Sequence, residues 1–522
     1  MNKLTYIKAF LTIASFTATT SLNAQVLNSK QVDSVVEKTL KTFDVPGIAV
    51  GIIKDGKVIH AKGYGVRSIK NNFKTDENTL FGVASNTKAM TAALLGMLVD
   101  EKKITWDTKV TNIIPEFKLY DTYATNEFTI RDLLTHRSGL GLGAGDLMIW
   151  PDSSTVTKTQ LIHNMRYLKP VSSFRSKYDY DNLLYIVAGE VIERVAKVSY
   201  DEFLESRIFK PLGMNKTAAS WYRLKDKANI IDGHAPYEGK LLPVGLSFGE
   251  IANAAGGVYS NVTDMAKWVT AMINGGRYGD KLQYSLFSQA VARELWTPQT
   301  LTNNAGSWDF ASYGLGWNVG TTNGNFEVKH TGGLSGIVTQ VIILPQHKLG
   351  IIVLTNQQSG AAFNAISSSI KDGYLGIKGI DRIKTYNDSR LAREKKADEI
   401  VSKIWSDIAA NQKSTSVKPE LANYAATFID LWFGEVSITQ QAKNGNLYFQ
   451  AKNSPKLRGD MSYYKGNTFI VKWYDRSLDA DAFVNFSLDH NGKADGFKIS
   501  AISPLTDFSF DFQDLDFKLK AN

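Results

Sequence analysis

The sequence predicts an α+β fold, in which an antiparallel sheet flanked by helices is joined to a helical region and followed by a small antiparallel β-barrel. Two β-rich runs, 48–53 and 58–65, meet across Asp55-Gly56, a dipeptide typical of hairpins. Residues from about 100 to 250 read mostly as helix and loop, and strand patterns return near 315–355, beginning with one at 314–319. One sheet assembled from both ends of a domain explains this order.

The barrel prediction rests on a change of pattern beyond Pro419. From there the chain consists of short alternating runs with turn residues between them, about eight strands in about 100 residues. The clearest runs are 434–439, 447–451, 468–473, 482–488, 495–499 and 508–512.

The length of 522 residues exceeds what one hydrophobic core usually serves, so two domains are expected. We place the first domain at 25–377, ending in a closing helix over 361–377. Residues 378–416 are rich in charge and are predicted to be a partly helical linker, and 417–522 form the barrel.

Residues 1–24 have the pattern of a secretory signal peptide. Lys3 and Lys8 precede an apolar run over 9–16, and small residues end at Ala24, before the expected cleavage site. The chain is therefore expected to be exported, to the periplasm or outside the cell. No other run approaches the ~20 apolar residues that a membrane-spanning helix needs, so we expect no span in the mature protein.

Composition excludes several classes of function. The chain has no cysteine, which rules out disulfides and thiolate metal sites, and its seven histidines are scattered without a His-x-x-x-His pair. We therefore expect no metal and no cofactor. The formal net charge of +9 is small for this length and gives no reason to expect a nucleic-acid partner.

The strongest chemical signal is Ser85 followed by Lys88 at the start of a predicted helix. Apolar residues at 90, 94, 97 and 98 lie on one helical face, and positions i and i+3 share a face, so the hydroxyl and the amine project together. A serine becomes a good nucleophile when a neighbouring base takes its proton. Lysine can be that base when burial or a nearby positive charge lowers its pKa.

Two further groups of residues lie downstream. Tyr180 and Asn182 lie at the start of a helix predicted over 182–198. A tyrosine beside a lysine can relay protons if the pKa of the tyrosine falls. An asparagine side chain can bind a substrate amide. The run His330-Thr331-Gly332-Gly333 follows a strand, where glycines let a substrate lie against the strand edge.

Serine-x-x-lysine, tyrosine-x-asparagine and a basic residue before Thr-Gly, in this order, resemble the motifs of the penicillin-recognising serine hydrolases. The chain is most similar to the class C β-lactamase-like branch, with its D-alanyl-D-alanine carboxypeptidases, D-aminopeptidases and esterases. The stretches 133–140, 211–214, 255–260 and 313–317 share the resemblance, which covers roughly 30–377. Residues 417–522 resemble the lipocalin-like domain that some members append, with three roles left open: capping the active site, binding a ligand and mediating oligomers.

The resemblance implies a role for each motif residue. Ser85 would be the acylated nucleophile and Lys88 its base, while Tyr180 would carry the proton to the leaving group and help activate the deacylating water. Asn182 would bind the substrate amide, with His330, Thr331 and Gly332 along the substrate. The backbone N–H groups of Ser85 and Gly333 would form the oxyanion hole.

His330 departs from the lysine found at this position in β-lactamases and most penicillin-binding proteins. A neutral histidine weakens the fixed positive charge that holds a β-lactam or peptide carboxylate. We therefore expect a peptidase or carboxypeptidase-like enzyme or an esterase, acting on a small-molecule or peptide substrate such as a cell-wall peptide. The alternatives are a true class C-type β-lactamase and a non-catalytic penicillin-binding-like sensor.

One rival motif is Gly245-x-Ser247-x-Gly249, the pattern of an α/β-hydrolase nucleophile elbow. That elbow requires a buried strand before the serine and a helix after it. Pro243 interrupts the first and Gly256-Gly257 shorten the second, so we interpret the stretch as a loop.

Overall fold

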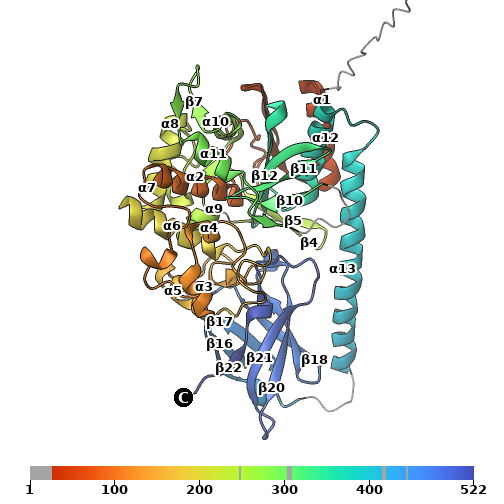
Figure 1. The fold of residues 1–522 in the computed structure, drawn as a ribbon. Coiled ribbons are helices and arrows are strands. Elements are labelled where there is room, and N and C mark those ends of the chain that lie inside the picture. The colour runs from red at the N-terminus through yellow and green to blue at the C-terminus, as the bar shows by residue number, and fades with distance from the viewer. Residues whose placement is uncertain (1–25, 246–248, 303–308, 414–418, 443–444, 522) are drawn as a thin grey trace, which may run out of the picture.

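The structure is a computed structural model that describes residues 26–245, 249–302, 309–413, 419–442 and 445–521. The predicted signal peptide and Ser247 lie outside the described residues. An α+β domain stands above a closed β-barrel, and one long helix runs along the side of both (Figure 1).

An eight-stranded antiparallel sheet forms the centre of the first domain. Strands from the beginning of the chain pair directly with strands from its end, as the sequence predicts: Ile48 lies opposite Thr355, and Ile52 opposite Ile351. In sheet order the strands are β2 (Lys57–Gly65), β1 (Gly47–Lys54), β14 (Leu349–Thr355), β13 (Ile337–Leu344), β12 (Asn325–Leu334), β11 (Asn318–Thr322), β10 (Ala311–Tyr313) and β9 (Thr300–Leu301).

Helices cover both faces of this sheet, which is why its central strands are apolar at successive positions rather than alternately. On β1, Ile48 and Val50 pack against α1 (Ser29–Phe43) and α12 (Gly360–Leu375). Ala49 and Ile53 face the opposite side, where α2 (Thr87–Asp100) and α10 (Val262–Ile273) lie. The closing helix predicted over 361–377 is thus confirmed as α12.

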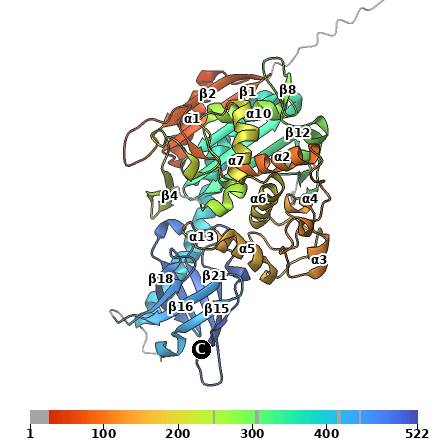
Figure 2. The ribbon, with the colours of Figure 1, turned by 90° about the vertical axis from the view of Figure 1, so that its left-hand side faces the viewer.

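In the chain, the helical region falls between the strands of the beginning and those of the end, and in space it packs beside the sheet and forms the other wall of the domain (Figure 2). Its helices are α3 (Thr122–Glu127), α4 (Ile130–Leu133), α5 (Lys158–Asn164), α6 (Leu183–Ala196), α7 (Tyr200–Leu204), α8 (Lys210–Leu212), α9 (Asn253–Gly256) and α11 (Gln289–Leu295). Three two-stranded ladders accompany them: β3 (Phe81–Gly82) with β6 (Tyr259–Ser260), β4 (Gly233–Tyr237) with β5 (Lys240–Val244), and β7 (Arg277–Tyr278) with β8 (Tyr284–Ser285).

The strand predicted over 314–319 is wrong in part. Residues 314–317 form the turn between β10 and β11, and only the last two residues belong to a strand. Gly316 has a φ of +77°, and a Cβ there would lie 2.6 Å from the carbonyl oxygen of Lys88. The glycine therefore permits a close approach between this turn and α2.

The charged stretch 378–416 contains one continuous helix, α13 (Arg382–Lys413), of 32 residues. Its first turn packs on the sheet domain through Ile383. Near its other end, Ile404 and Ile408 pack against Ile470 and Ile502 of the barrel. This helix therefore packs on both the sheet domain and the barrel. Its mostly polar sequence does not predict these two contacts.

The barrel is closed and antiparallel. Aromatic rings fill its interior: Phe428 lies 5.0 Å from Phe497, and Phe497 lies 4.4 Å from Phe517, between ring centroids. Its strands are β15 (Ala426–Asp430), β16 (Gly434–Gln440), β17 (Leu447–Ala451), β18 (Arg458–Lys465), β19 (Thr468–Trp473), β20 (Ala482–Leu488), β21 (Ala494–Ala501) and β22 (Phe517–Leu519).

The strand predicted at 508–512 is wrong. These residues lie in the connection between β21 and β22, outside the barrel sheet. Two of the three alternating rings, Phe510 and Phe512, are buried, and Phe510 packs beside Trp150 of the helical region. Alternating apolar residues indicate that one side of a segment is buried. They do not indicate which part of the protein covers that side.

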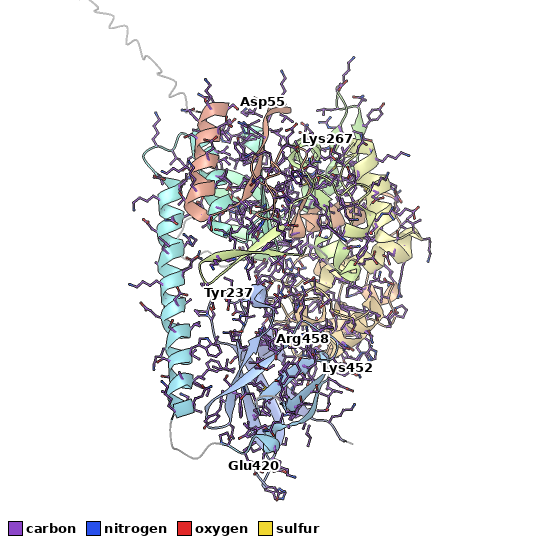
Figure 3. The ribbon with its side chains drawn as sticks, turned by 180° about the vertical axis from the view of Figure 1, so that it is seen from behind. Asp55, Tyr237, Lys267, Glu420, Lys452 and Arg458 are labelled. Carbon is purple, nitrogen blue, oxygen red and sulfur yellow. The ribbon has the colours of Figure 1, made fainter. Side chains whose placement is uncertain are left out.

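The barrel also meets the β4–β5 hairpin, which extends toward it and carries Tyr237 (Figure 3). The guanidinium of Arg476 in the barrel lies 5.3 Å from the centre of the Tyr237 ring. No helix among the described residues is both long enough and apolar enough to cross a lipid bilayer.

Candidate active site

Ser85 lies in a single 3₁₀ turn, Ala84–Asn86, that leads into α2. Ala84 has a φ of +51°, in the left-handed region that a residue with a Cβ rarely adopts. Such strain persists only where surrounding contacts fix the backbone, and it clusters at functional sites. Here the side chains of Asn86 and Thr339 hydrogen-bond each other and the carbonyl oxygen of Val83, which holds the turn against β13.

Lys88 is fully buried and its side chain turns toward the serine. Its Nζ donates to Oγ of Ser85 at 3.1 Å, to Oδ1 of Asn182 at 2.7 Å and to the carbonyl oxygen of Ala255 at 2.9 Å. Burial lowers the pKa of Lys88 to about 7, although Asp146 and Asp181 act in the opposite direction. The amine therefore loses its proton near neutral pH.

The environment of α2 explains this burial. The spacing of its apolar residues suggests one buried face, but residues 87–98 are buried on all sides. The helices α6, α7, α9 and α11 all contact α2, and the turn between β10 and β11 approaches it at Lys88. A lysine in this helix cannot reach bulk water along its own face.

Asn182 connects Lys88 to a carboxyl group that the sequence analysis missed. Its Nδ2 donates to Oδ2 of Asp146 at 2.7 Å, while its Oδ1 accepts from Lys88. Asp146 is fully buried, and burial together with the neighbouring Asp181 raises its pKa well above the usual range. A lone aspartate in a glycine-rich loop gives no sequence signal for this role.

Tyr180 is half-buried beside Ser85 and Lys88. The Lys88 Nζ lies 4.9 Å from the centre of its ring, and the Ser85 hydroxyl is near enough to lower the pKa of the phenol. Burial has the larger effect, and the net pKa is raised well above 10. The lowered pKa that the sequence analysis required for a proton relay is therefore not found: Tyr180 is a neutral phenol in this resting site.

His136 supports Tyr180 from behind. The two ring centroids are 4.3 Å apart, and Nδ1 of His136 accepts the backbone N–H of Asp181 at 3.1 Å. Burial lowers the pKa of His136, which keeps the ring neutral and able to accept this bond. His136 thus fixes the backbone between Tyr180 and Asn182.

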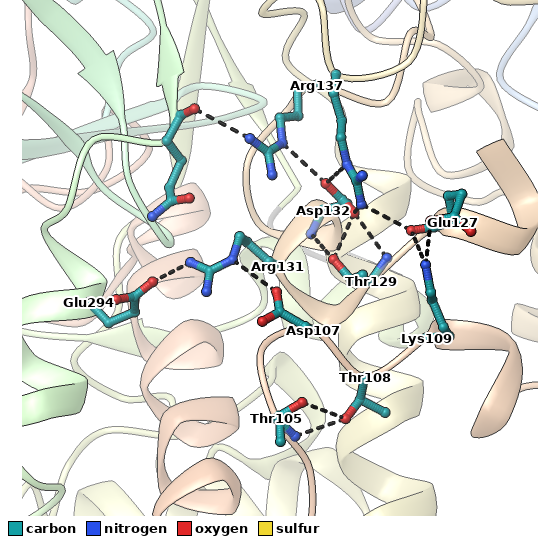
Figure 4. Close-up of polar contacts among 12 residues, drawn as sticks. Thr105, Asp107, Thr108, Lys109, Glu127, Thr129, Arg131, Asp132, Arg137 and Glu294 are labelled. Carbon is teal, nitrogen blue, oxygen red and sulfur yellow. Dashed lines mark hydrogen bonds and ion pairs between the residues drawn. The ribbon is translucent and has the colours of Figure 1, made fainter.

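A buried carboxylate, Asp132, locks the loop that carries His136 (Figure 4). It accepts from Nε of Arg137 at 3.1 Å, from the guanidinium of Arg175 at 2.6 Å and from Oγ1 of Thr129 at 2.7 Å. Arg137 and Arg175 also pair through their backbones. The loop that contains His136 is thereby tied to the segment that leads to Tyr180.

The edge of β12 forms the opposite side of the site. β11 pairs with β12 only as far as Lys329, so residues 330–334 are free of that neighbour. A Cβ on Gly332 would lie 2.4 Å from the carbonyl oxygen of Val83 and 2.9 Å from Cβ of Ala84, so only glycine lets the Ser85 turn approach the strand. At Gly333, nothing would lie within 4 Å of a Cβ.

His330 is buried and neutral. Its Nε2 lies 2.8 Å from Oη of Tyr313, and its Nδ1 lies 2.6 Å from the carbonyl oxygen of Thr331. Burial, and then the charge of Lys88, lower its pKa to about 3. This position therefore supplies no positive charge at neutral pH.

A cavity of about 580 Å³ opens between the helical region, β12 and the barrel. Of the residues that the sequence singled out, its wall contains Ser85, Tyr180, Asn182, His330, Thr331 and Gly333, while Gly332 packs beneath the Ser85 turn. In the described ranges, no three histidine or acidic side chains are grouped so that they could hold a metal ion.

Comparison with known proteins identifies the family of the first domain. Residues 32–369 match the family described as Beta-lactamase, and residues 410–519 match a domain of unknown function, DUF3471. Unguisins hydrolase ungD' of Aspergillus campestris is 28% identical over 440 residues, which cover 80% of this chain and 79% of that protein. Protein flp of Staphylococcus aureus is 26% identical over 340 residues, 64% of each chain.

The fold is also found in a solved structure. The octameric penicillin-binding protein homologue from Pyrococcus abyssi superposes with a TM-score of 0.61 at 21% sequence identity, covering 94% of this chain and 100% of that one. This likeness extends over both parts of the chain and concerns the fold.

Proposed function

Because this chain belongs to the β-lactamase family and is a serine hydrolase of that family, we propose that it cleaves an amide or ester through an acyl-enzyme on Ser85. The observation that carries the proposal is the buried Lys88, with Nζ 3.1 Å from Oγ of Ser85 and a pKa lowered to about 7. A base that titrates near the working pH is best suited to proton transfer.

In this mechanism the Oγ of Ser85 attacks the carbonyl carbon while Lys88 takes the hydroxyl proton. The leaving group receives a proton through the neutral phenol of Tyr180, which lies beside both residues. In the second half of the reaction water gives a proton to Lys88 as it attacks the acyl-enzyme, and Lys88 passes that proton to Oγ as it leaves. Asn182 holds Lys88 in place and presents its amide to the substrate.

The open edge of β12 supports a place for the substrate backbone. An extended substrate can lie along residues 330–334, which lack the neighbouring strand. The backbone N–H groups of Ser85 and Gly333 are our candidates for the oxyanion hole, since preorganised donors at the developing negative charge supply much of the catalysis in acyl transfer.

We infer a peptidase-like or esterase-like substrate rather than a β-lactam. The neutral His330 offers no cation for a carboxylate. One relative is named unguisins hydrolase, and this name does not refer to β-lactams. Peptides of the cell wall are among the candidate substrates. The pattern of residues 1–24 supports export to the periplasm or beyond, which N-terminal sequencing of the mature protein would test.

The proposal is tested with a panel of nitrocefin, p-nitrophenyl esters, D-alanyl-D-alanine peptides and amino-acid amides. We expect turnover of an ester or amide, a Ser85 adduct by mass spectrometry, and loss of both in Ser85→Ala. Efficient nitrocefin hydrolysis would instead identify a β-lactamase. Folded protein that neither turns over a substrate nor is labelled by a fluorophosphonate would be a non-catalytic binding protein.

A further inference from the structure

A second contact between a serine and a histidine lies on the other side of the sheet from the active site. Ser29 is the first residue of α1, and its Oγ lies 3.0 Å from Nδ1 of His60 on β2. His60 pairs across the strands with Ile52, which packs in the same cluster as α1. The helix α2, which follows Ser85, covers the opposite face (Figure 1). The contact therefore takes no part in the mechanism proposed for Ser85.

A chain of hydrogen bonds connects Ser29 to a carboxylate. Beyond the serine, the chain continues from Nε2 of His60 to Oη of Tyr64 at 2.8 Å, and from this Oη to Oδ1 of Asp33 at 2.6 Å. The Nζ of Lys62 lies 3.0 Å from the other carboxyl oxygen of Asp33. The hydrogen bond from Tyr64 and the charge of Lys62 lower the pKa of Asp33, so this group is an ionised acceptor.

The carboxylate fixes the direction of every hydrogen bond in the chain. Tyr64 donates its single hydroxyl proton to Asp33, so its Oη accepts a proton from Nε2 of His60. Burial raises the pKa of Tyr64 and lowers the pKa of His60, which keeps both rings neutral. A neutral imidazole with its proton on Nε2 has a free electron pair on Nδ1. This Nδ1 therefore accepts the hydroxyl proton of Ser29, the arrangement that a general base requires.

The two ends of the chain differ in their access to water. His60 and Tyr64 are each 6% exposed, whereas Ser29 is exposed. An acyl donor can therefore reach the hydroxyl without entering the active-site cavity, while the base behind it is shielded. Ser29 also lies at the N-terminal end of a 15-residue helix, whose positive end favours the negative charge that develops on an attacked carbonyl oxygen.

We propose that Ser29 is a second reactive serine, which accepts an acyl group from activated esters of carboxylic acids. Its Oγ attacks the carbonyl carbon and forms a C–O bond, while its proton passes to Nδ1 of His60. The bond between the carbonyl carbon and the leaving oxygen breaks, and that oxygen departs with the electron pair and takes the proton from His60. Tyr64 and Asp33 are positioning residues that hold His60 in the required tautomer. The product is an O-acyl serine at the start of α1.

The test measures acetylation of the full chain by p-nitrophenyl acetate. The Ser85→Ala variant is used as the parent, because it removes the competing nucleophile. Peptide mass spectrometry over a time course gives the rate of acetylation at each serine. The reference is Ser176, an exposed serine whose hydroxyl donates to a backbone carbonyl oxygen instead of a histidine. We expect Ser29 to be acetylated at least about 100-fold faster than this reference serine.

Variants in the same parent identify the source of this reactivity. His60→Gln should lower the rate at Ser29 to that of the reference serine, because the base is lost. Tyr64→Phe keeps the ring but lets the imidazole proton move to Nδ1, so the rate should fall at least about tenfold. Tyr386→Phe is the matched control, because its hydroxyl bonds a different serine and its ring packs on the same cluster as α1. It should leave the rate at Ser29 unchanged.

Thermal unfolding followed by circular dichroism establishes that each variant is folded. Acetylation of Ser29 no faster than the reference serine would overturn the inference, and so would an unchanged rate in folded His60→Gln or Tyr64→Phe. If Tyr64→Phe does not fold, Asp33→Asn replaces it, since this change keeps the shape of the side chain and removes the charge at the end of the chain. The rate at Ser29 should then fall at least about fivefold, and an unchanged rate refutes the proposed chain.

Discussion

The Nζ of Lys88 lies 3.1 Å from the Oγ of Ser85, inside a helix that is buried on every side. Because water cannot solvate an ammonium there, the pKa of Lys88 is lowered to about 7. The same contact therefore joins the proposed nucleophile to a proposed base that is half deprotonated near neutral pH.

Activity should depend on pH through Lys88. A general base works only when deprotonated, so kcat/KM should rise about tenfold per pH unit below pH 7 and level off above it. Lys88→Arg, which stays protonated, should lose about 100- to 10,000-fold in kcat/KM. A pH profile of p-nitrophenyl ester hydrolysis measures both effects, and a flat profile between pH 5 and 9 would contradict the role of Lys88.

His330 should not contribute to that profile. Its pKa is lowered to about 3, so it stays neutral across the working range. His330→Gln keeps a neutral, hydrogen-bonding side chain and should leave the inflection near pH 7 in place, whatever its effect on rate. Disappearance of the inflection in this variant would assign it to His330 instead of Lys88.

The sequence predicted the sheet, the barrel and the Ser85–Lys88 contact because each depends on local periodicity or on an i, i+3 spacing. Asp146 and His136 could not be predicted, since their importance comes from contacts made across the fold to Asn182 and Asp181. The strand predicted at 508–512 was wrong for a related reason. Its phenylalanines alternate, but Phe510 packs beside Trp150 and Phe508 contacts the Tyr180 ring, both in the first domain.

Gly332 should be required for the position of the Ser85 turn. In Gly332→Ala the new Cβ would lie 2.4 Å from the carbonyl oxygen of Val83, so the turn or β12 must move. A displacement of about 1 Å can cost about 100-fold in rate, and we expect a loss of that order in kcat. Gly360→Ala, whose Cβ would make only ordinary contacts at 3.7 Å with Phe363, is the control and should retain activity.

Asp132 should stabilise the loops behind the site. Burial alone raises its pKa, but hydrogen bonds from Arg175 and Thr129 outweigh burial, and the net pKa is lowered. The carboxylate of Asp132 therefore stabilises the folded protein above the ordinary carboxyl pKa of about 3.9, and this stabilisation is lost as pH falls through the lowered pKa. Asp132→Asn should reduce the free energy of unfolding by about 1.5–3 kcal/mol at pH 7.

Urea unfolding followed by near-UV circular dichroism measures the effect of Asp132→Asn. Asp388→Asn is the control, because Asp388 pairs with Lys384 on the exposed surface of α13 and should give no measurable change. If Asp132→Asn unfolds at the same urea concentration as the parent at pH 7, the carboxylate does not stabilise these loops.

Asp511 of the barrel should help to position Lys88, the proposed base. Its carboxyl accepts the N–H groups of Gly145 and Leu147, and Asp146 between them holds Asn182, which holds Lys88. Asp511→Ala leaves both N–H groups without an acceptor, so the loop should shift and admit water to Lys88. We expect kcat/KM at pH 7 to fall about 10- to 100-fold. The inflection of the pH profile should move up from about 7, because a better solvated ammonium holds its proton longer.

The direction of this pH shift separates a positioning role from simple loss of stability, which lowers the amount of folded enzyme without moving the inflection. Asp489→Ala provides the matched control, because Asp489 also accepts two backbone N–H groups, from Asn491 and Lys493, in the turn between β20 and β21. It should leave the inflection where it is. A lower rate in Asp511→Ala with an unmoved inflection would mean that the barrel anchors the loop without influencing Lys88.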